Sequence, residues 1–154
     1  MTKRIYFCAI CLVVWLFTGC AWTPQEKSAE KQIISSANAP KAIGPYSQAV
    51  RVGNTLYCSG QIAIDPATGK MISGTIEEET RQVLENLGAV LKEAGMDFND
   101  VVRATVYMTD IENYKKINAV YSEFFSESKP ARAAVQVVNL PAGANVEISC
   151  IAQK

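Results

Sequence analysis

The run Val146-Glu147-Ile148-Ser149-Cys150-Ile151-Ala152, close to the C-terminus, predicts a β-strand with two different faces. Successive side chains of a strand point to opposite faces of its sheet. One face of this strand therefore carries Val146, Ile148, Cys150 and Ala152, and the other carries Glu147, Ser149 and Ile151. If the first, apolar set packs against helices, Glu147 lies on a face of the sheet that no helix covers.

A second closing strand is predicted over residues 131–138, in the run Lys129-Pro130-Ala131-Arg132-Ala133-Ala134-Val135-Gln136-Val137. Arg132 follows a turn-marking proline, so it begins this strand and does not lie on a solvated helix. A guanidinium binds a carboxylate through two parallel hydrogen bonds. Arg132 near Glu147 therefore suggests a site for a small acid, and a structural ion pair at the end of a sheet is the alternative interpretation.

The segments upstream alternate between strand-like and helix-like patterns. Strand-like runs at 48–52 and 55–59 flank Gly53-Asn54, which is typical of a hairpin turn. Helical periodicity extends from Thr75 to Gly95, a strand pattern covers 101–108, and a second helix follows Asp110. With the closing strands at 131–138 and 145–152, the order is β-β-α-β-α-β-β. It predicts an α+β sandwich with two helices on one face of a mixed sheet.

Both helices have sequence signals of their own. Thr75-Ile76-Glu77-Glu78 is a capping-box pattern, which predicts the start of the first helix. Glu77, Glu78 and Glu79 fall in its first turn, where negative charge favours the helix dipole, and we expect them to be solvated. The second helix carries an apolar stripe, interpreted as core and not as a cofactor site, at Ile111, Tyr114, Ile117, Tyr121, Phe124 and Phe125.

Strand parity also predicts an apolar surface. Tyr57, Val135 and Ile151 are candidates for the same uncovered face of the sheet as Glu147 and Ser59. A surface of this kind is unusual for a monomer, so we expect it to contact another subunit.

Charge and composition narrow the possible functions. The 15 basic and 15 acidic residues balance, and without Lys3 and Arg4 the count is 13 against 15, a net charge of −2. A domain of this charge lacks the basic stripe that nucleic-acid binding requires. The chain has no histidine, which excludes Ser-His-Asp and Cys-His nucleophile systems and most zinc sites. Its chemistry has to use Arg, Glu, Tyr, Ser, backbone groups and water.

The N-terminal residues predict export. Lys3 and Arg4 precede an apolar stretch from Ile5 to Phe17, and its length of about thirteen residues fits a signal peptide better than a membrane span. Leu16-Phe17-Thr18-Gly19-Cys20 resembles the bacterial lipobox, in which the cysteine is lipidated, except that Phe17 stands where leucine is usual. An uncleaved signal anchor and an ordinary cleaved secretion signal are the alternatives.

We therefore expect three parts: a signal peptide over 1–19, a lipidated Cys20 with a flexible tether to residue 32, and a domain over 33–154. The mature protein would be an exported, lipid-anchored bacterial membrane protein on the periplasmic or cell-surface side. Only Cys58 and Cys150 lie in the domain, both in apolar strand-like runs. We expect buried thiols there and no disulfide.

Four short motifs, taken together and in this order, carry a family resemblance: Gly44-Pro45-Tyr46-Ser47-Gln48-Ala49, Ser59-Gly60-Gln61, Pro130-Ala131-Arg132 and Val146-Glu147-Ile148. From about Ile33 to the C-terminus the chain resembles the Rid family of reactive-intermediate (enamine/imine) deaminases. The resemblance implies a chorismate mutase-like fold, a homotrimer with clefts between subunits, and no metal or organic cofactor.

The resemblance also assigns roles to residues. It implies that Arg132 binds the substrate carboxylate and that Glu147 lies near the hydrolytic water. Tyr46 and Ser59 would complete the polar lining. Family members often have cysteine where this chain has Ala134, at a position whose backbone contacts the substrate. For Tyr46 a packed loop anchor, and for Ser59 a satisfied strand hydroxyl, are the structural alternatives.

The implied activity is hydrolytic deamination of 2-aminoacrylate and 2-iminopropionate to a 2-oxo acid and ammonia. The substrate would be a small imino or enamino acid. A non-catalytic module that binds or senses small carboxylates is the alternative. The family is also associated with ribonuclease activity and translation inhibition, which the neutral charge, the absence of histidine and the predicted lipid anchor disfavour. The predicted export is the main departure, since the familiar deaminases are cytosolic.

Overall fold

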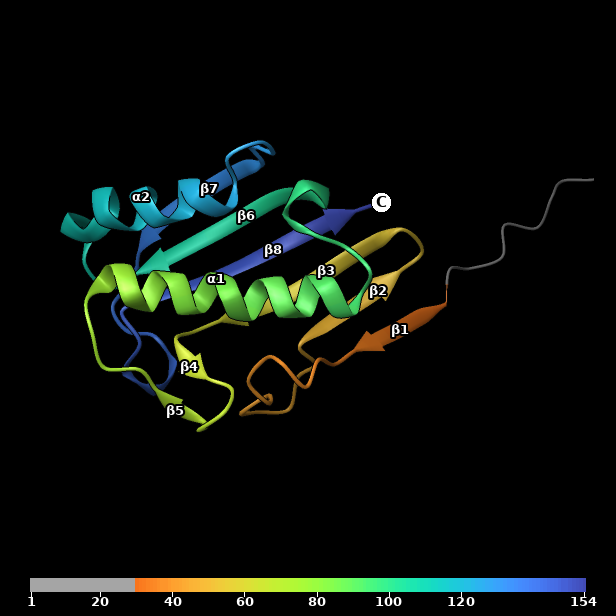
Figure 1. The fold of residues 1–154 in the computed structure, drawn as a ribbon, viewed down its shortest axis with the longest axis horizontal. Helices are drawn as coiled ribbons and strands as arrows, with labels where there is room; N and C mark the ends of the chain where they lie inside the picture. The colour runs from red at the N-terminus through yellow and green to blue at the C-terminus, as the bar shows by residue number, and fades with distance from the viewer. Residues whose placement is uncertain (1–29) are drawn as a thin grey trace, which may run out of the picture.

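The computed structural model describes residues 30–154, which form a six-stranded sheet covered by two helices on one face (Figure 1). The sheet order is β1-β2-β3-β8-β6-β7, and only the pairing of β6 with β7 is parallel. The strands are β1 (Lys31–Ile34), β2 (Ala49–Val52), β3 (Thr55–Gln61), β6 (Val101–Met108), β7 (Ala131–Gln136) and β8 (Val146–Gln153). The predicted α+β architecture and its mixed sheet are confirmed.

The structure adds short elements to the predicted order. β1 pairs with β2, so the sheet begins at Lys31, two residues before the expected start of the domain. The turn at 65–70 closes a separate two-stranded hairpin of β4 (Ile64–Asp65) and β5 (Lys70–Met71). Short 3-10 helices occupy Phe98–Asp100, Ile111–Asn113 and Pro141–Gly143. The predicted signal peptide and Cys20 lie outside the described residues.

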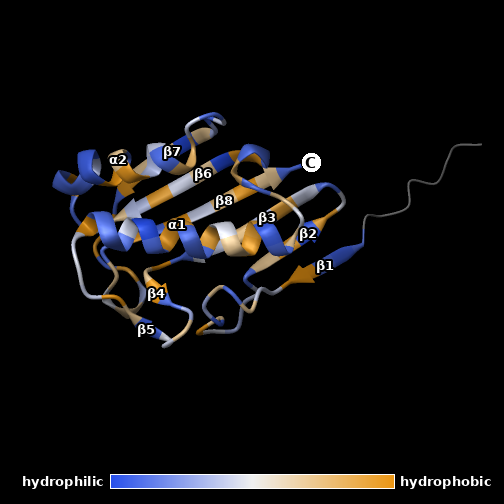
Figure 2. Cartoon of the chain, in the orientation of Figure 1, coloured by the Kyte–Doolittle hydropathy of each residue, from blue (hydrophilic) through white to orange (hydrophobic). Residues whose placement is uncertain are grey.

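The helices α1 (Ile76–Glu93) and α2 (Tyr114–Phe124) bury their apolar sides against the sheet (Figure 1). α1 packs against β3 and β8, and α2 packs against α1. The hydropathy colouring shows polar residues along the side of α1 that faces away from the sheet (Figure 2). The core between the layers contains Leu84, Leu87 and Leu91 of α1, all fully buried. No helix among residues 30–154 is both long and apolar enough to span a membrane.

The predicted start of α1 is confirmed, with one correction. Thr75 and Glu78 form the capping box, each satisfying a backbone amide of the other. The expectation that Glu79 is solvated is wrong, because its side chain is buried. Its carboxylate accepts hydrogen bonds from the backbone and the side-chain amide of Asn145, at 3.3 and 2.7 Å. Glu79 thereby ties the first turn of α1 to the residue that precedes β8.

The two faces of β8 differ as its alternation predicts. Val146, Ile148, Cys150 and Ala152 are buried under the helices, whereas Glu147, Ser149 and Ile151 are partly exposed on the other face. The uncovered face also carries Tyr57 and Val135, whose side chains are 50% and 41% exposed. Exposed apolar side chains therefore share with Glu147 the face opposite the helices.

Candidate active site

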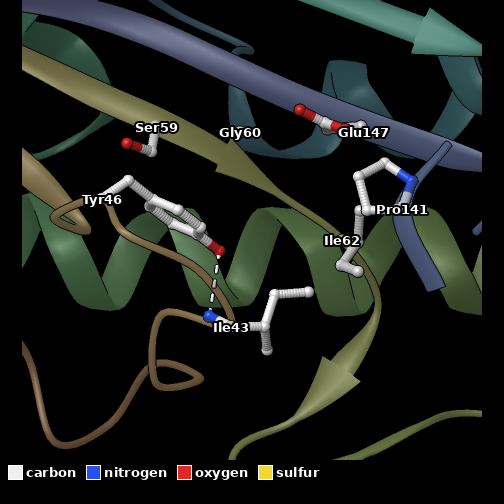
Figure 3. Close-up of a pocket in the computed structure, with 7 residues that line it drawn as sticks. All are labelled: Ile43, Tyr46, Ser59, Gly60, Ile62, Pro141 and Glu147. Carbon is white, nitrogen blue, oxygen red and sulfur yellow. Dashed lines mark hydrogen bonds between the residues drawn. The ribbon is translucent and has the colours of Figure 1, made fainter.

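Glu147 projects from the uncovered face of β8 directly over Gly60 of β3 (Figure 3). The two strands shift register between Cys58 and Gln61, which is where Gly60 lies. A β-carbon at Gly60 would overlap the Glu147 side chain, coming within 2.6 Å of its carboxyl carbon. Glycine at position 60 is therefore what allows the Glu147 carboxylate to rest against the β3 backbone.

A cleft of about 280 Å³ opens beside this carboxylate, and we call it the glutamate cleft. Its lining is Ile43, Tyr46, Ser59, Gly60, Ile62, Pro141 and Glu147 (Figure 3). Two of the predicted site residues, Tyr46 and Ser59, thus share one cleft with Glu147. The remaining wall is mostly apolar, and the cleft is large enough for a molecule of a few heavy atoms.

The two hydroxyl groups that line the glutamate cleft each make one hydrogen bond within the chain. The Ser59 hydroxyl donates a hydrogen bond to the Ser47 carbonyl at 2.7 Å, so its lone pairs remain free to accept. The Tyr46 hydroxyl accepts a 3.3 Å hydrogen bond from the Ile43 amide, and its own proton remains free (Figure 3). Each hydroxyl therefore fixes its local loop and still offers one function to a ligand.

The Glu147 carboxylate has no hydrogen bond or ion pair to any other residue between 30 and 154. Its side chain is only partly exposed, and burial raises the pKa of this carboxyl above its ordinary value. A carboxylate with a raised pKa and free lone pairs is suited to accepting a proton from a water molecule.

Arg132 lies on the opposite face of the sheet. β6 runs between the strands that carry the two residues, and its Ala104 pairs with Arg132 on one side and Cys150 on the other. Tyr107, three residues further along β6, pairs with Val135 and Glu147. Because Ala104 and Tyr107 point to opposite faces, one chain does not bring Arg132 and Glu147 together. Neither the predicted two-residue site nor an ion pair between them forms within this chain.

Arg132 occupies a second cleft of about 570 Å³, which we call the arginine cleft. Its lining is Ile111, Glu112, Tyr114, Lys115, Arg132 and Ala134. Arg132 and Ala134, predicted together as substrate-binding residues, therefore lie in the same cleft. The Arg132 guanidinium donates a 3.3 Å hydrogen bond to the Tyr114 hydroxyl and forms no ion pair with any carboxylate in the described part of the chain.

The cysteines contribute structure. Cys58 and Cys150 are opposite each other in the pairing of β3 with β8, and both are buried free thiols. A hydrogen bond with Cys58, together with burial, raises the pKa of the Cys150 thiol far above its ordinary value. The Cys150 thiol is therefore protonated at neutral pH. Residues 30–154 also hold no cluster of three or more His, Cys, Asp or Glu that could bind a metal ion.

The sequence interpretation missed several residues of the two clefts. Tyr114 was placed in the core, but its side chain is exposed at the rim of the arginine cleft. Ile43, Ile62 and Pro141 come from loops, where no periodic pattern marks a lining residue. The Ser-Gly-Gln motif did contain a signal at Gly60, since a glycine in a strand marks a bulge or a close approach.

Comparison with known proteins places the chain in a family. The family model described as Endoribonuclease L-PSP matches residues 36–154. The 2-iminobutanoate/2-iminopropanoate deaminase of Bos taurus is 53% identical over 125 residues, covering 81% of this chain and 91% of the bovine protein.

Solved structures agree with this placement. A protein of the conserved Rid family from Yersinia pestis superposes with a TM-score of 0.79 at 46% identity, covering 81% of this chain and all of that one. TdcF of E. coli, with bound serine, gives 0.76 at 40% identity, covering 80% and 98%. The chain therefore belongs to the endoribonuclease L-PSP family, which confirms the resemblance to the Rid proteins that its four motifs predict.

Proposed function

We propose that this protein hydrolyses reactive imines and enamines derived from amino acids, of the 2-aminoacrylate/2-iminopropionate type, to 2-oxo acids and ammonia. The observation that carries the proposal is the Glu147 carboxylate, which makes no hydrogen bond or ion pair with residues 30–154 and lies in a small cleft beside Tyr46 and Ser59. The relatives named 2-iminobutanoate/2-iminopropanoate deaminase, about half identical to this chain, support the same activity.

The chemistry follows from the groups in the cleft. Glu147 accepts a proton from water while the water oxygen bonds to the C=N carbon, and it passes this proton to the imine nitrogen to give a neutral carbinolamine. Glu147 then accepts the proton of the carbinolamine hydroxyl and delivers it to the amino nitrogen as the C–N bond breaks. Ammonia leaves, and the oxygen becomes the ketone of the 2-oxo acid. One positioned acid–base group contributes a factor on the order of 10²–10⁴, which suffices for an imine that also hydrolyses unaided.

The substrate carboxylate requires Arg132, and we propose that a neighbouring copy supplies it in a homotrimer. The opposite-face placement of Arg132 and Glu147 supports this, because a second copy can present its arginine cleft to the first copy's glutamate cleft. The exposed Tyr57 and Val135, on the same face of the sheet as Glu147, also favour a covered surface. The serine bound to E. coli TdcF supports a ligand of the amino-acid class.

We further propose that the mature protein is exported and lipid-anchored through Cys20. The support is the sequence alone, namely Lys3 and Arg4, the apolar stretch after them, and the lipobox-like run that ends at Cys20. Its substrates there would be imines formed from amino acids in the compartment to which the protein is exported.

A small-carboxylate binder without turnover is the second candidate, and the serine-bound relative favours it as much as it favours an enzyme. The two differ in one measurement. An amino-acid oxidase generates the imine in the cuvette, and semicarbazide traps what remains of it. We expect the protein to lower the amount of trapped imine for alanine- and 2-aminobutyrate-derived substrates. Unchanged trapping with measurable 2-oxo acid binding would support the binder instead.

The shared site has a sharper test in subunit mixing. Arg132→Lys and Glu147→Gln are each expected to lose most of their activity when tested alone. If the site combines Arg132 of one copy with Glu147 of another, unfolding and refolding an equal mixture restores about one quarter of the wild-type sites, those between two intact halves. No activity in the mixture, with the trimer re-formed, would contradict a site shared between copies.

A further inference from the structure

Two tyrosines of α2 enclose the guanidinium of Arg132. Tyr114 and Tyr121 are seven residues apart, so they lie two turns apart on nearly the same side of the helix. β7 carries Arg132 on the helix-covered face of the sheet, at its edge. The chain thus brings one cation and two aromatic rings together next to the arginine cleft.

The distances describe a defined contact. The Arg132 Cζ atom lies 4.7 Å from the centre of the Tyr121 ring and 5.8 Å from that of Tyr114. Both values fall within the range in which a cation is attracted to a ring face. The guanidinium also donates to the Tyr114 hydroxyl at 3.3 Å. It is therefore held by one hydrogen bond and two rings.

The Tyr121 ring is a fixed support. It is buried and stacks on Phe125, with ring centres 4.2 Å apart and an interplanar angle of 20°. Its hydroxyl is buried without a hydrogen-bond partner among the described residues, and burial raises the pKa of Tyr121 to about 12. No hydrogen bond with the described residues therefore explains a tyrosine at this position, whereas the face of its ring contacts Arg132.

Arg132 retains most of its donors for a ligand. A guanidinium has five N–H groups, and the only hydrogen bond it makes within residues 30–154 uses one of them. Glu112 lines the same cleft without forming an ion pair with it. Two adjacent N–H groups therefore stay free for a carboxylate.

We propose that Tyr121 and Tyr114 are positioning residues, which hold the Arg132 guanidinium in the orientation that receives the substrate carboxylate. The Tyr121 ring fixes the plane of the guanidinium, and the Tyr114 hydroxyl fixes its rotation. This inference rests on the proposed function, since it assigns to Arg132 the carboxylate of the imino acid. Both tyrosines act through Arg132 and contact no reacting atom.

The test compares matched variants in the full-length protein, purified in detergent. Tyr121→Phe keeps the ring and should show the wild-type KM, with a thermal transition as high as wild type or higher. Tyr121→Leu removes the ring face and should raise KM by about 3- to 30-fold while kcat changes little. Tyr114→Phe should raise KM by about 2- to 10-fold, because only the hydrogen bond is lost.

A second readout does not depend on turnover. Binding of 2-oxobutanoate, measured by calorimetry, should weaken by the same factors as KM rises. On the Arg132→Lys background, Tyr121→Leu should cause no further loss, because the group it positions is absent. If Tyr121→Leu fails to fold, variants of the exposed Tyr114 decide the question. Tyr114→Phe removes only the hydroxyl, and Tyr114→Leu removes the ring as well.

The contrary results are distinct. Wild-type KM and 2-oxobutanoate affinity in a folded Tyr121→Leu protein, or in both Tyr114 variants, would overturn the positioning role. So would a Tyr121→Phe protein as impaired as Tyr121→Leu. If Arg132→Lys itself keeps the wild-type KM, it is the proposed carboxylate site that fails, and not merely its support.

Discussion

Arg132 and Glu147 point to opposite faces of one sheet, although only β6 separates the strands that carry them. A ligand in the glutamate cleft of a chain therefore cannot reach that chain's own guanidinium through the sheet. Each chain presents two separate clefts, one that contains the Glu147 carboxylate and one that contains the Arg132 guanidinium.

Arg132→Lys should reduce kcat/KM by about 10- to 100-fold with the thermal transition unchanged. Lysine keeps the charge but replaces a planar fork with a point charge, so the bidentate grip is lost, and hydrogen bonds to charged groups contribute about 1.5–3 kcal/mol each. Steady-state kinetics and a melting curve measure both quantities. Near-wild-type turnover in a folded variant would remove Arg132 from the site.

Glu147→Gln should lower kcat by about 100-fold or more and change KM less, because its proposed partner is water and not the substrate. The pH profile provides the accompanying test. Activity should fall as the pH drops through the raised pKa of Glu147, since the carboxylate must be ionised to accept a proton. Glu147→Gln should lack this fall in activity at low pH. A rise in KM as large as the fall in kcat would indicate a binding role.

The free energy of unfolding should also depend on pH through the raised pKa of Glu147. Because the pKa of Glu147 is higher in the folded than in the unfolded chain, the folded protein binds this proton more tightly. The free energy of unfolding therefore decreases as the pH rises from the ordinary pKa of glutamate through the raised one. Glu147→Gln removes this contribution, which denaturant titrations at several pH values measure.

Gly60→Ala should reduce activity by on the order of 10- to 100-fold, because the added methyl group displaces the Glu147 carboxylate. The control is a double-mutant cycle with Glu147→Ala. If the methyl group acts through Glu147, Gly60→Ala adds no further loss to that variant. Independent, additive losses would assign Gly60 another role.

The domain lacking residues 1–20 should be a homotrimer by light scattering at micromolar concentration. Tyr57→Glu should dissociate it and abolish activity, since it places a charge among the exposed apolar side chains of the uncovered face. Ser122→Glu, on the exposed side of α2, serves as the matched control and should leave the trimer intact. A monomeric wild-type domain with full activity would contradict the shared site.

Residues 1–19 should be removed and Cys20 should carry lipid in the mature protein. Several acyl chains together hold a protein stably in a membrane, whereas one holds it only marginally, so we expect the protein in the membrane fraction. Cys20→Ser should block labelling by a radioactive fatty acid and leave deaminase activity unchanged. If the wild-type protein also takes up no radioactive fatty acid, an uncleaved signal anchor is favoured instead.

The sequence predicted those parts of the fold that have a strong local signal. The alternation of Val146 to Ala152 determined both faces of β8, and the capping box marked the first turn of α1. β1, β4 and β5 were not predicted, because β4 and β5 have only two residues each and the run Lys31–Ile34 shows no alternation of polar and apolar residues. Glu79 was misjudged because its burial depends on Asn145, which is distant in sequence.

For the candidate site, the motifs identified Tyr46, Ser59 and Glu147, and the structure gathers them in one cleft. The motifs could not show that Arg132 faces the other way. That fact depends on the register of the parallel pairing between β6 and β7, which no local pattern encodes. The contact of Tyr114 and Tyr121 with Arg132 was not predicted for a related reason. An aromatic stripe has the same sequence pattern whether its rings pack in a core or contact a guanidinium.

The position of β8 in the sheet gives the two clefts different rigidity. β8 is paired on both sides, by β3 and β6, whereas β7 is paired by β6 alone. In a folded protein, central strands open only when most of the structure opens, while edge strands open locally at a smaller cost in free energy. We therefore expect amide hydrogens in the middle of β8, such as that of Cys150, to exchange with deuterated solvent more slowly than that of Arg132 on β7. A ligand bound by both Glu147 and Arg132 should therefore slow hydrogen exchange mainly along β7.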